Sequence, residues 1–222
     1  LALGAWRISK QHVLTRRIPA IETLGSATVL CVDKTGTITQ NRMAVRELCT
    51  IEDCHVVETL AQQSLPNKFH ELVEYSVLAS DVDPFDPMEK ALKQVGDDYL
   101  ARTEHLHHDW QIWHEYPLSG ELLAMSCVWQ SPDHRVVIAT KGAPEAIADL
   151  CHFTAEQMHD LEQQISTMAA SGLRVLGIAK AIGQHQPDRH LRMLPENQHD
   201  FEFAFLGLIG LADPVRPTVA PA

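Results

Sequence analysis

Two apolar segments that each end in an aspartate stand toward the two ends of this 222-residue chain. Residues 27–32, ATVLCV, lead into Asp33, and residues 201–212, FEFAFLGLIGLA, lead into Asp213. Residues 27–32 form a short, continuously apolar run of the kind that is typical of a strand buried on both faces, as in a parallel sheet. We expect both strands to belong to one sheet. Asp33 then lies at the carboxyl end of a strand, where open α/β sheets bind their ligands.

The residues between these segments carry helix and strand patterns of their own. The link SPDH, residues 131–134, has hairpin chemistry and predicts antiparallel strands on either side. Thr154 and Gln157 stand at capping-box spacing before a helical stripe. Helices are predicted at 1–18, 67–81, 86–100, 143–151 and 154–172, strands at 110–118, 122–130, 135–142 and 173–182, and a loop at 183–200. The sequence therefore predicts an α/β block with an antiparallel sheet, inserted between two parts of another domain.

Charge and apolar runs limit the partners of this chain. Its formal net charge of -11 argues against nucleic acid, because binding to phosphate backbones needs clustered Lys and Arg. No apolar run approaches the roughly 20 residues that cross a bilayer, so we expect the chain as given to be soluble. Its five cysteines form no CxxC pair and follow no secretory signal. This pattern predicts reduced thiols and no disulfides.

The stretch DKTGT, residues 33–37, has the chemistry of a phosphoryl acceptor. Asp33 supplies a carboxylate nucleophile, Lys34 places a cation beside it, and Gly36 exposes backbone amides. Hydrolases with an aspartyl-phosphate commonly carry a second carboxyl group, as general acid and base, two residues after the nucleophile. Thr35 stands at that position and has no proton that titrates near neutral pH. An acyl-phosphate on Asp33 should therefore persist, which suits a pump better than a phosphatase.

Three motifs, in this order, resemble those of P-type ATPases, the ion pumps that form an aspartyl-phosphate from ATP. They are the phosphorylation motif CVDKTGTITQNRM (31–43), the nucleotide-domain motif KGAPEAI (141–147) and the hinge motif ADPVRP (212–217). The resemblance implies part of a haloacid-dehalogenase-like, Rossmann-type phosphorylation domain, interrupted by an inserted nucleotide-binding domain. It implies a stalk helix end at 1–25, the first part of the phosphorylation domain at 26–45, the nucleotide-binding domain at 46–205, and the hinge and return at 206–222.

The resemblance assigns the phosphorylation chemistry to four residues. It implies that Asp33 is phosphorylated, that Lys34 contacts the transferred phosphate, and that Thr37 lies beside that phosphate. It also implies that Asp33 and the backbone carbonyl of Thr35 hold Mg²⁺. This set is physically reasonable, because Mg²⁺ prefers a few protein oxygens together with phosphate oxygens and water.

The resemblance places ATP in the inserted domain. Glu89 of DPMEKAL matches a nucleotide-contacting acid, although alone it could be a solvated helix residue. Lys141 and Gly142 match the floor of the ATP pocket, and Arg174 of GLRVLGIA matches an arginine that reaches the phosphates. Without their motifs, Lys141 could be an exposed loop lysine and Arg174 could extend along the surface.

Asp213 and Arg216 match hinge residues that help to hold the nucleotide. An alternative is that these two residues pair with each other and cap a loop.

One segment departs from the family pattern. Many members have an aromatic residue that stacks on adenine and a basic residue two positions later, where this chain has Leu118 and Gly120. A leucine covers a purine face without the stacking geometry of an aromatic ring. Strand alternation keeps Tyr116 from taking the place of Leu118. We therefore expect weak binding of ATP.

Two other classes of function stay open. The chain could be a soluble haloacid-dehalogenase-type phosphatase, although Thr35 and the lack of downstream TGD and GDGxND motifs argue against it. It could also be a nucleotide-binding module that is inactive on its own. The run HLHHD, residues 105–109, together with His114, invites a metal site, but adjacent histidines in a loop are more often solvated.

The resemblance favours one branch of the pump family. KGAPE and DPVRP, without a His-Pro pair, are similar to calcium, sodium and proton pumps, and calcium is our narrower expectation. The transported cation would bind in transmembrane helices that this chain lacks. The full-length protein is then expected in the cell membrane, with this part on the cytoplasmic face.

Overall fold

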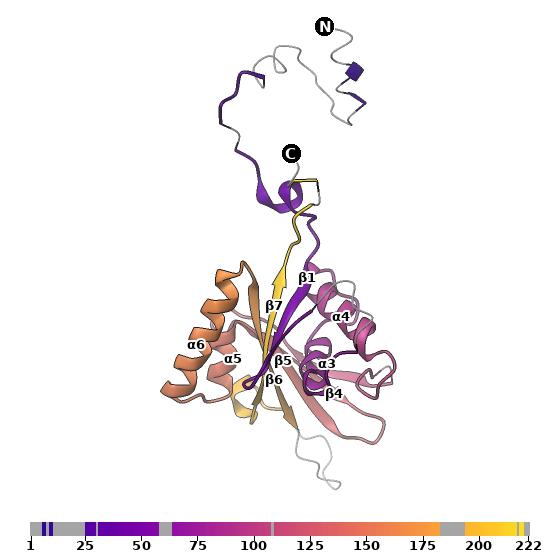
Figure 1. The fold of residues 1–222 in the computed structure, drawn as a ribbon. Coiled ribbons are helices and arrows are strands. Elements are labelled where there is room, and N and C mark those ends of the chain that lie inside the picture. Colours follow the sequence, from indigo (N-terminus) through magenta and orange to yellow (C-terminus); the bar gives the residue numbers. More distant parts are fainter. Residues whose placement is uncertain are drawn as a thin grey trace.

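A computed structural model of the chain describes residues 6–7, 9–10, 25–29, 31–57, 64–107, 109–182, 194–216 and 218–219. Its body is a seven-stranded sheet with helices on both faces (Figure 1). The strand order is β2-β1-β7-β6-β5-β4-β3, and every neighbouring pair is antiparallel. The strands are β1 Ala44–Cys49, β2 Cys54–Val56, β3 Gln111–Tyr116, β4 Ala124–Gln130, β5 Val136–Gly142, β6 Arg174–Ile182 and β7 Ala204–Ala212.

Two pairs of helices cover the two faces of the sheet. The described helices are α3 His70–Leu78, α4 Pro87–Leu100, α5 Pro144–Leu150 and α6 Ala155–Ala170, with short 3₁₀ turns at Asn67–Phe69 and Gln198–Asp200. Side chains of β7 alternate between the faces: Ile209 packs into the core under α3 and α4, whereas Leu208 packs into the core that α6 covers. This alternation is what a strand with helices on both sides requires.

Local capping signals explain where two of the helices begin. Asp86 caps α4, because its Oδ1 accepts hydrogen bonds from the backbone amides of Met88 at 2.7 Å and Glu89 at 3.2 Å. Thr154 and Gln157 form the predicted capping box at the start of α6. Both caps satisfy backbone amides of the first turn and so set where each helix begins.

Most of the inserted block agrees with the sequence-based prediction. The helices α3 to α6 and the strands β3 to β6 lie within their predicted ranges, and residues 131–134 join β4 and β5 as an antiparallel hairpin. The helical pattern noted from about residue 51 to residue 100 extends too far toward the N-terminus, because residues 54–56 form the strand β2. Residues 6, 7 and 9 are helical, but most of the helix expected at 1–18, and residues 183–193 of the expected loop, lie outside the described residues.

The predicted strand at 27–32 is wrong in this structure. Its described residues form no strand, and Val29 and Val32 are 78% and 48% exposed. The expected partner, β7, is already paired on both sides, with β1 and β6. Residues 27–32 therefore have no strand to pair with in the described part of the chain, and the proposed common sheet does not form.

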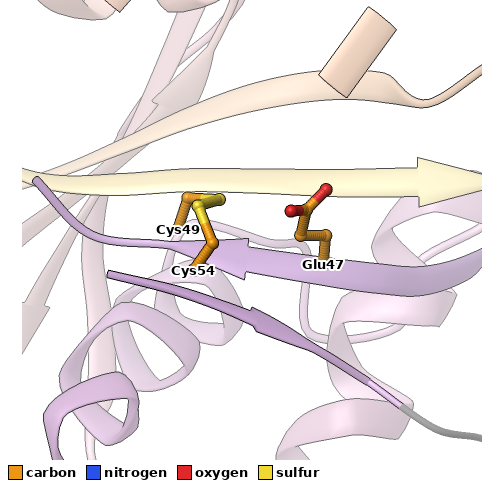
Figure 2. Close-up of side chains that lie close together, drawn as sticks. All are labelled: Glu47, Cys49 and Cys54. Carbon is orange, nitrogen blue, oxygen red and sulfur yellow. A yellow bond between two sulfur atoms is a disulfide. The ribbon is translucent and has the colours of Figure 1, made fainter. Parts of the chain in front are cut away.

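The expectation of five reduced thiols is also wrong. Cys49 and Cys54 form a disulfide between β1 and β2 (Figure 2). The prediction considered CxxC spacing and the compartment, but it missed the hairpin that places these two residues directly opposite each other. Their Cα atoms lie 4.1 Å apart, so the register itself brings the sulfur atoms into bonding range.

Among the described residues, none of the helices combines the length and the apolar character needed to cross a membrane.

Candidate functional site

The predicted site residues lie at or beside one end of the strands, where the chain enters β1 and leaves β7 (Figure 1). This end of the strands is called the sheet edge, as distinct from the outermost strand β2. β5 and β7 end at this edge, and β4 and β6 begin there. The register orders the site across the strands: Lys141 lies opposite Ile178 of β6, and Arg174 lies opposite Leu211 of β7. Since Asp213 follows Leu211 by two residues, Arg174 stands between Lys141 and Asp213.

Lys141 is a buried cation whose protons are all bound by protein groups. Its Nζ donates to Glu89 Oε1 at 2.6 Å, to Ala79 O at 2.5 Å and to Ser80 Oγ at 3.1 Å. Three acceptors satisfy the three donors of an ammonium group. The side chains of Lys141 and Glu89 are only 8% and 13% exposed. Lys141 therefore lies below the surface at this edge, beside the slightly more exposed carboxylate of Glu89.

Two opposing effects set the pKa of Lys141. Burial lowers the pKa of Lys141 below its ordinary value, while the hydrogen bond and the negative charge of Glu89 act in the opposite direction. Glu89 is thus the group that keeps the buried ammonium charged.

Gly142 and Arg174 shape the rest of this edge. A Cβ on Gly142 would lie 2.3 Å from the Leu123 carbonyl oxygen, so the close approach of β4 requires glycine there. Arg174 is exposed, and its Nη1 lies 3.7 Å from Met88 Sδ at the start of α4. Among the described residues, no carboxylate pairs with Arg174. The guanidinium is therefore available to an anionic ligand.

The aromatic position of the family pattern is open in this chain. Leu118 is 59% exposed beyond the end of β3. Tyr116 is buried and donates its hydroxyl hydrogen to Pro195 O at 2.6 Å, so its ring cannot stack on a ligand. Phe85 is 93% exposed one residue before the Asp86 cap of α4, and its ring centroid lies 5.4 Å from Lys90 Nζ.

The Asp33 turn, residues 33–39, stands outside the sheet beside the end of β7. Thr39 N donates to Lys34 O at 3.0 Å, and Gly36 takes the positive φ of 77° that this turn needs. An isolated bridge pairs Thr39 with Val215. The segment that leads into β1 and the segment that follows β7 therefore lie side by side at this point.

Asp213 and Arg216 bind this turn, and no hydrogen bond or ion pair joins them to each other among the described residues. Asp213 Oδ2 accepts from Thr39 Oγ1 at 2.5 Å, and its Oδ1 accepts from Arg42 N at 3.1 Å. Arg216 donates from Nε to Thr39 O at 3.0 Å and from Nη2 to Gly36 O at 2.9 Å. The mutual ion pair considered from the sequence is thus not what holds the hinge.

The hinge carboxylate is held in its ionised form. Partial desolvation raises the pKa of Asp213, but hydrogen bonds from Thr39 and from the amides of residues 40–42 outweigh this effect. The net pKa of Asp213 lies below its ordinary value. Thr39, which sequence reasoning overlooked, is buried at this point and supplies the strongest of these contacts.

Asp33, Lys34, Thr35 and Thr37 are exposed together on the turn. Within the described residues, no hydrogen bond or ion pair joins them to Lys141, Glu89 or Arg174. The structure therefore presents two groups of site residues: one around Lys141, and one at the hinge and the Asp33 turn.

A cavity of about 620 Å³ lies beside the hinge, between α4 and the start of β1. Its lining includes Arg42, Lys90, Gln94 and Asp98, and it contains neither Glu89 nor Lys141. Glu89 and Lys90 therefore lie on different surfaces of α4.

The histidines of the 105–109 run are engaged by protein groups. The two carboxylate oxygens of Glu74 lie at hydrogen-bond distance from these rings, 2.5 Å from His105 Nδ1 and 2.7 Å from His107 Nε2. His107 also stacks on Trp110, with ring centroids 3.8 Å apart. These contacts favour a structural role for the described histidines of the run.

Comparison with known proteins agrees with this architecture. The chain is 30% identical to "Calcium-transporting ATPase 1" of Bacillus cereus, over 99% of this chain and 26% of the relative. It is 26% identical to "Calcium-transporting ATPase" of Bacillus subtilis, over 100% of this chain and 28% of the relative. It is 28% identical to "Calcium-transporting ATPase type 2C member 1" of Homo sapiens, over 100% and 26%. The chain spans about a quarter of the length of these relatives.

A family match identifies the sheet domain. Residues 85–218 match the family described as "P-type ATPase, cytoplasmic domain N". This match covers more than half of the chain, including β3 to β7 and the hinge residues. The chain therefore belongs to the P-type ATPase family.

Proposed function

We propose that this chain is the catalytic cytoplasmic part of an ATP-driven cation pump, in which ATP held at the sheet edge phosphorylates Asp33. One observation carries the proposal. Along one edge, the register across β5, β6 and β7 brings together the buried Lys141, then Arg174, which has no carboxylate partner among the described residues, and then Asp213. The carboxylate of Asp213 in turn holds the Asp33 turn through Thr39. A nucleotide lying along this edge would have its phosphates directed toward the hinge.

The side chains divide the binding between them. Lys141 and Gly142 form a closed floor, and Glu89 offers a carboxylate oxygen that Lys141 does not use to a donor on the base. Arg174 supplies a guanidinium for the phosphates, for which its donor geometry is well suited. Asp213 and Arg216 act by positioning the turn.

The Asp33 turn fits a Mg²⁺-assisted phosphoryl acceptor. Asp33 and the carbonyl of Thr35 offer hard oxygen ligands of the kind that Mg²⁺ prefers. When bound, the ion would neutralise charge on the transferred phosphoryl group. Lys34 adds a second cation beside the nucleophile, and Thr35 cannot serve as the general base for rapid hydrolysis.

We further propose that the full-length protein resides in a membrane, with this part on the cytoplasmic face, and that it transports Ca²⁺. The support is that the relatives described above are calcium-transporting ATPases. The cation-binding groups would lie outside this chain.

Nucleotide titration of the chain tests the binding half of the proposal. We expect ATP to bind with a Kd above the micromolar range, since Leu118 replaces an aromatic platform. Arg174→Ala should weaken the binding of ATP far more than that of adenosine, whereas the exposed control Arg135→Ala should change neither. Equal weakening for both ligands would contradict the assignment of Arg174 to the phosphates.

Incubation with γ-labelled ATP and Mg²⁺ tests the chemical half. The expected product is an acid-stable, hydroxylamine-labile label that Asp33→Asn removes and the exposed control Asp97→Asn retains. Rapid release of phosphate from small phosphoesters would favour the phosphatase instead. Binding without a label, in a protein extended to the length of its relatives, would leave only a nucleotide-binding module.

A further inference from the structure

A half-buried carboxylate stands beside the Cys49–Cys54 disulfide at the outer edge of the sheet. Glu47 and Cys49 are two residues apart on β1, so they share a face, and Cys54 is the cross-strand partner of Cys49. One carboxylate oxygen and the two sulfur atoms all lie within 4.8 Å of one another. Figure 2 shows the three side chains on the same side of the β1–β2 pair. Among the described residues, no hydrogen bond or ion pair occupies Glu47.

A fourth polar group reaches this cluster from helix α6. Gln164 Nε2 lies 3.4 Å from Cys54 Sγ and 3.4 Å from Thr50 O. A 180° rotation of the Gln164 side-chain amide would present its oxygen in place of its nitrogen. Cys49 is fully buried in the core with Met168 of α6, whereas Cys54 is exposed. The cluster therefore has a dry floor and one side open to solvent.

We propose that reduction of this disulfide creates a Zn²⁺ site formed by Cys49, Cys54 and Glu47, with Gln164 or water as the fourth ligand. A dithiol reductant transfers two electrons and two protons, so that the protein disulfide becomes two thiols and the reductant becomes a disulfide. Binding of Zn²⁺ then releases the two thiol protons. This site is separate from the ATP-binding edge and does not depend on the function proposed above.

The donor set selects the metal. Two thiolates and one carboxylate suit Zn²⁺, which takes tetrahedral sulfur, nitrogen and oxygen ligands, and they are unsuitable for Mg²⁺ or Ca²⁺. A disulfide has no thiolate to offer, so oxidation removes the site. The remaining thiols do not compete as a pair: burial raises the pKa of Cys127 and Cys151 to about 12, and Cys31 is exposed.

The site would fasten the strand that leads from the hinge. β1 begins two residues after Arg42, whose amide binds Asp213, and β2 is held to the sheet only by β1 among the described strands. Either the disulfide or the metal would keep β2 in place. Reduced, metal-free protein should then lose order at β2 first.

Metal titration of the chain in a Cys31→Ser background tests the proposal. The protein is reduced with a phosphine, freed of reductant under argon, and titrated with Zn²⁺ against a chromophoric chelator; Co²⁺ serves as the spectroscopic probe. We expect one Zn²⁺ per reduced chain, a thiolate-to-cobalt charge-transfer band, and no such binding after oxidation. Cys54→Ser should weaken binding by more than about 100-fold, and Glu47→Gln by about 10-fold to 100-fold, in the range known for groups around metal sites.

Glu52→Gln is the matched control, because Glu52 is an exposed acid in the loop between the two cysteines. It should leave the affinity for Zn²⁺ unchanged. Equal Zn²⁺ binding by oxidised and reduced protein, or equal losses in Glu47→Gln and Glu52→Gln, would overturn the proposal. If Cys54→Ser does not fold, alkylation of the unmutated cysteines decides: Zn²⁺ must protect Cys49 and Cys54 together, and failure to protect them refutes the site.

Discussion

Replacing Glu89 by glutamine should destabilise the fold by removing the charge that compensates Lys141. Glutamine keeps the size and an acceptor oxygen, so the 2.6 Å hydrogen bond can persist while the counter-charge is lost. Breaking a buried ion pair by removing one partner costs about 3–5 kcal/mol. Because Lys141 retains Ala79 O and Ser80 Oγ, and glutamine keeps an acceptor oxygen, we expect a loss of about 2 kcal/mol for glutamine, the size of one hydrogen bond to a charged group. Alanine removes the acceptor as well, and should cost about 4 kcal/mol, within the range for a buried pair that loses one partner.

The loss should depend on pH in a defined direction. The folded-state pKa of Lys141 lies below its unfolded value, so between the two values the unfolded chain binds more protons and stability rises with pH. Removing Glu89 lowers the folded pKa further, because its charge and hydrogen bond act to raise that pKa. The increase of stability with pH therefore begins at a lower pH in the Glu89 variant than in the unsubstituted chain. The stability gap between the variant and the unsubstituted chain should therefore narrow as the pH rises through the two folded-state pKa values of Lys141, both of which lie below the ordinary pKa of lysine.

Urea unfolding followed by tryptophan fluorescence measures both effects, since Trp129 is buried beside α3 and binds Leu78 O. Glu162→Gln, on the exposed side of α6, is the control and should stay within about 0.5 kcal/mol of the unsubstituted chain. In a Lys141→Met background, Glu89→Gln should cost little. A gap that is constant with pH, or one of similar size in that background, would refute a charged Lys141 that depends on Glu89.

Three further predictions concern packing, the ligand edge and a helix cap. Gly142→Ala should lower the free energy of unfolding by about 1–3 kcal/mol, because its Cβ would collide with β4; an unchanged urea midpoint would contradict this close approach. Leu118→Phe should raise ATP affinity by about 2-fold to 10-fold in a nucleotide titration, since a ring that stacks adds about 0.5–1.5 kcal/mol; no change would place Leu118 away from the base. Thr154→Ala should cost about 1 kcal/mol in thermal unfolding by removing half of the capping box, and Thr167→Ala, exposed on the same helix, should cost less.

The inserted domain was predictable because its signals are local. The stripe of α4, its Pro87 entry, and the capping box of α6 each specify an element within a few residues. The apolar run 201–212 also became a strand, β7, as its composition predicts. The same composition at 27–32 did not suffice, since a strand needs a neighbour, and β7 is already paired on both sides.

Other features depended on contacts that are distant in sequence. β1 and β2 are short and irregular in pattern, and β1 is defined by its pairing with β7, more than 150 residues later. The Cys49–Cys54 bond follows from that hairpin and not from any cysteine motif. At the site, motif matching named Glu89 and Lys141 separately, but only the fold shows that they bind each other. The roles of Thr39 and Ser80 likewise required their partners to be placed.

The hinge contacts limit how the two groups of site residues can meet. Asp213 and Arg216 fasten Thr39 to the end of β7, and β7 is paired with the strand that carries Arg174. Thr39 must therefore move with the sheet for as long as these bonds hold. Asp33 lies on the far side of Gly36, whose positive φ of 77° marks a backbone position with the freedom that other residues lack. If ATP at the sheet edge is to reach Asp33, either a rotation at Gly36 must break the bond from Thr39 N to Lys34 O, or the bonds of Asp213 must break. In the first case the bonds that Asp213 and Arg216 make to Thr39 and Arg42 persist through phosphorylation, and in the second, opening must replace the hydrogen bonds that Asp213 accepts from Thr39 and Arg42.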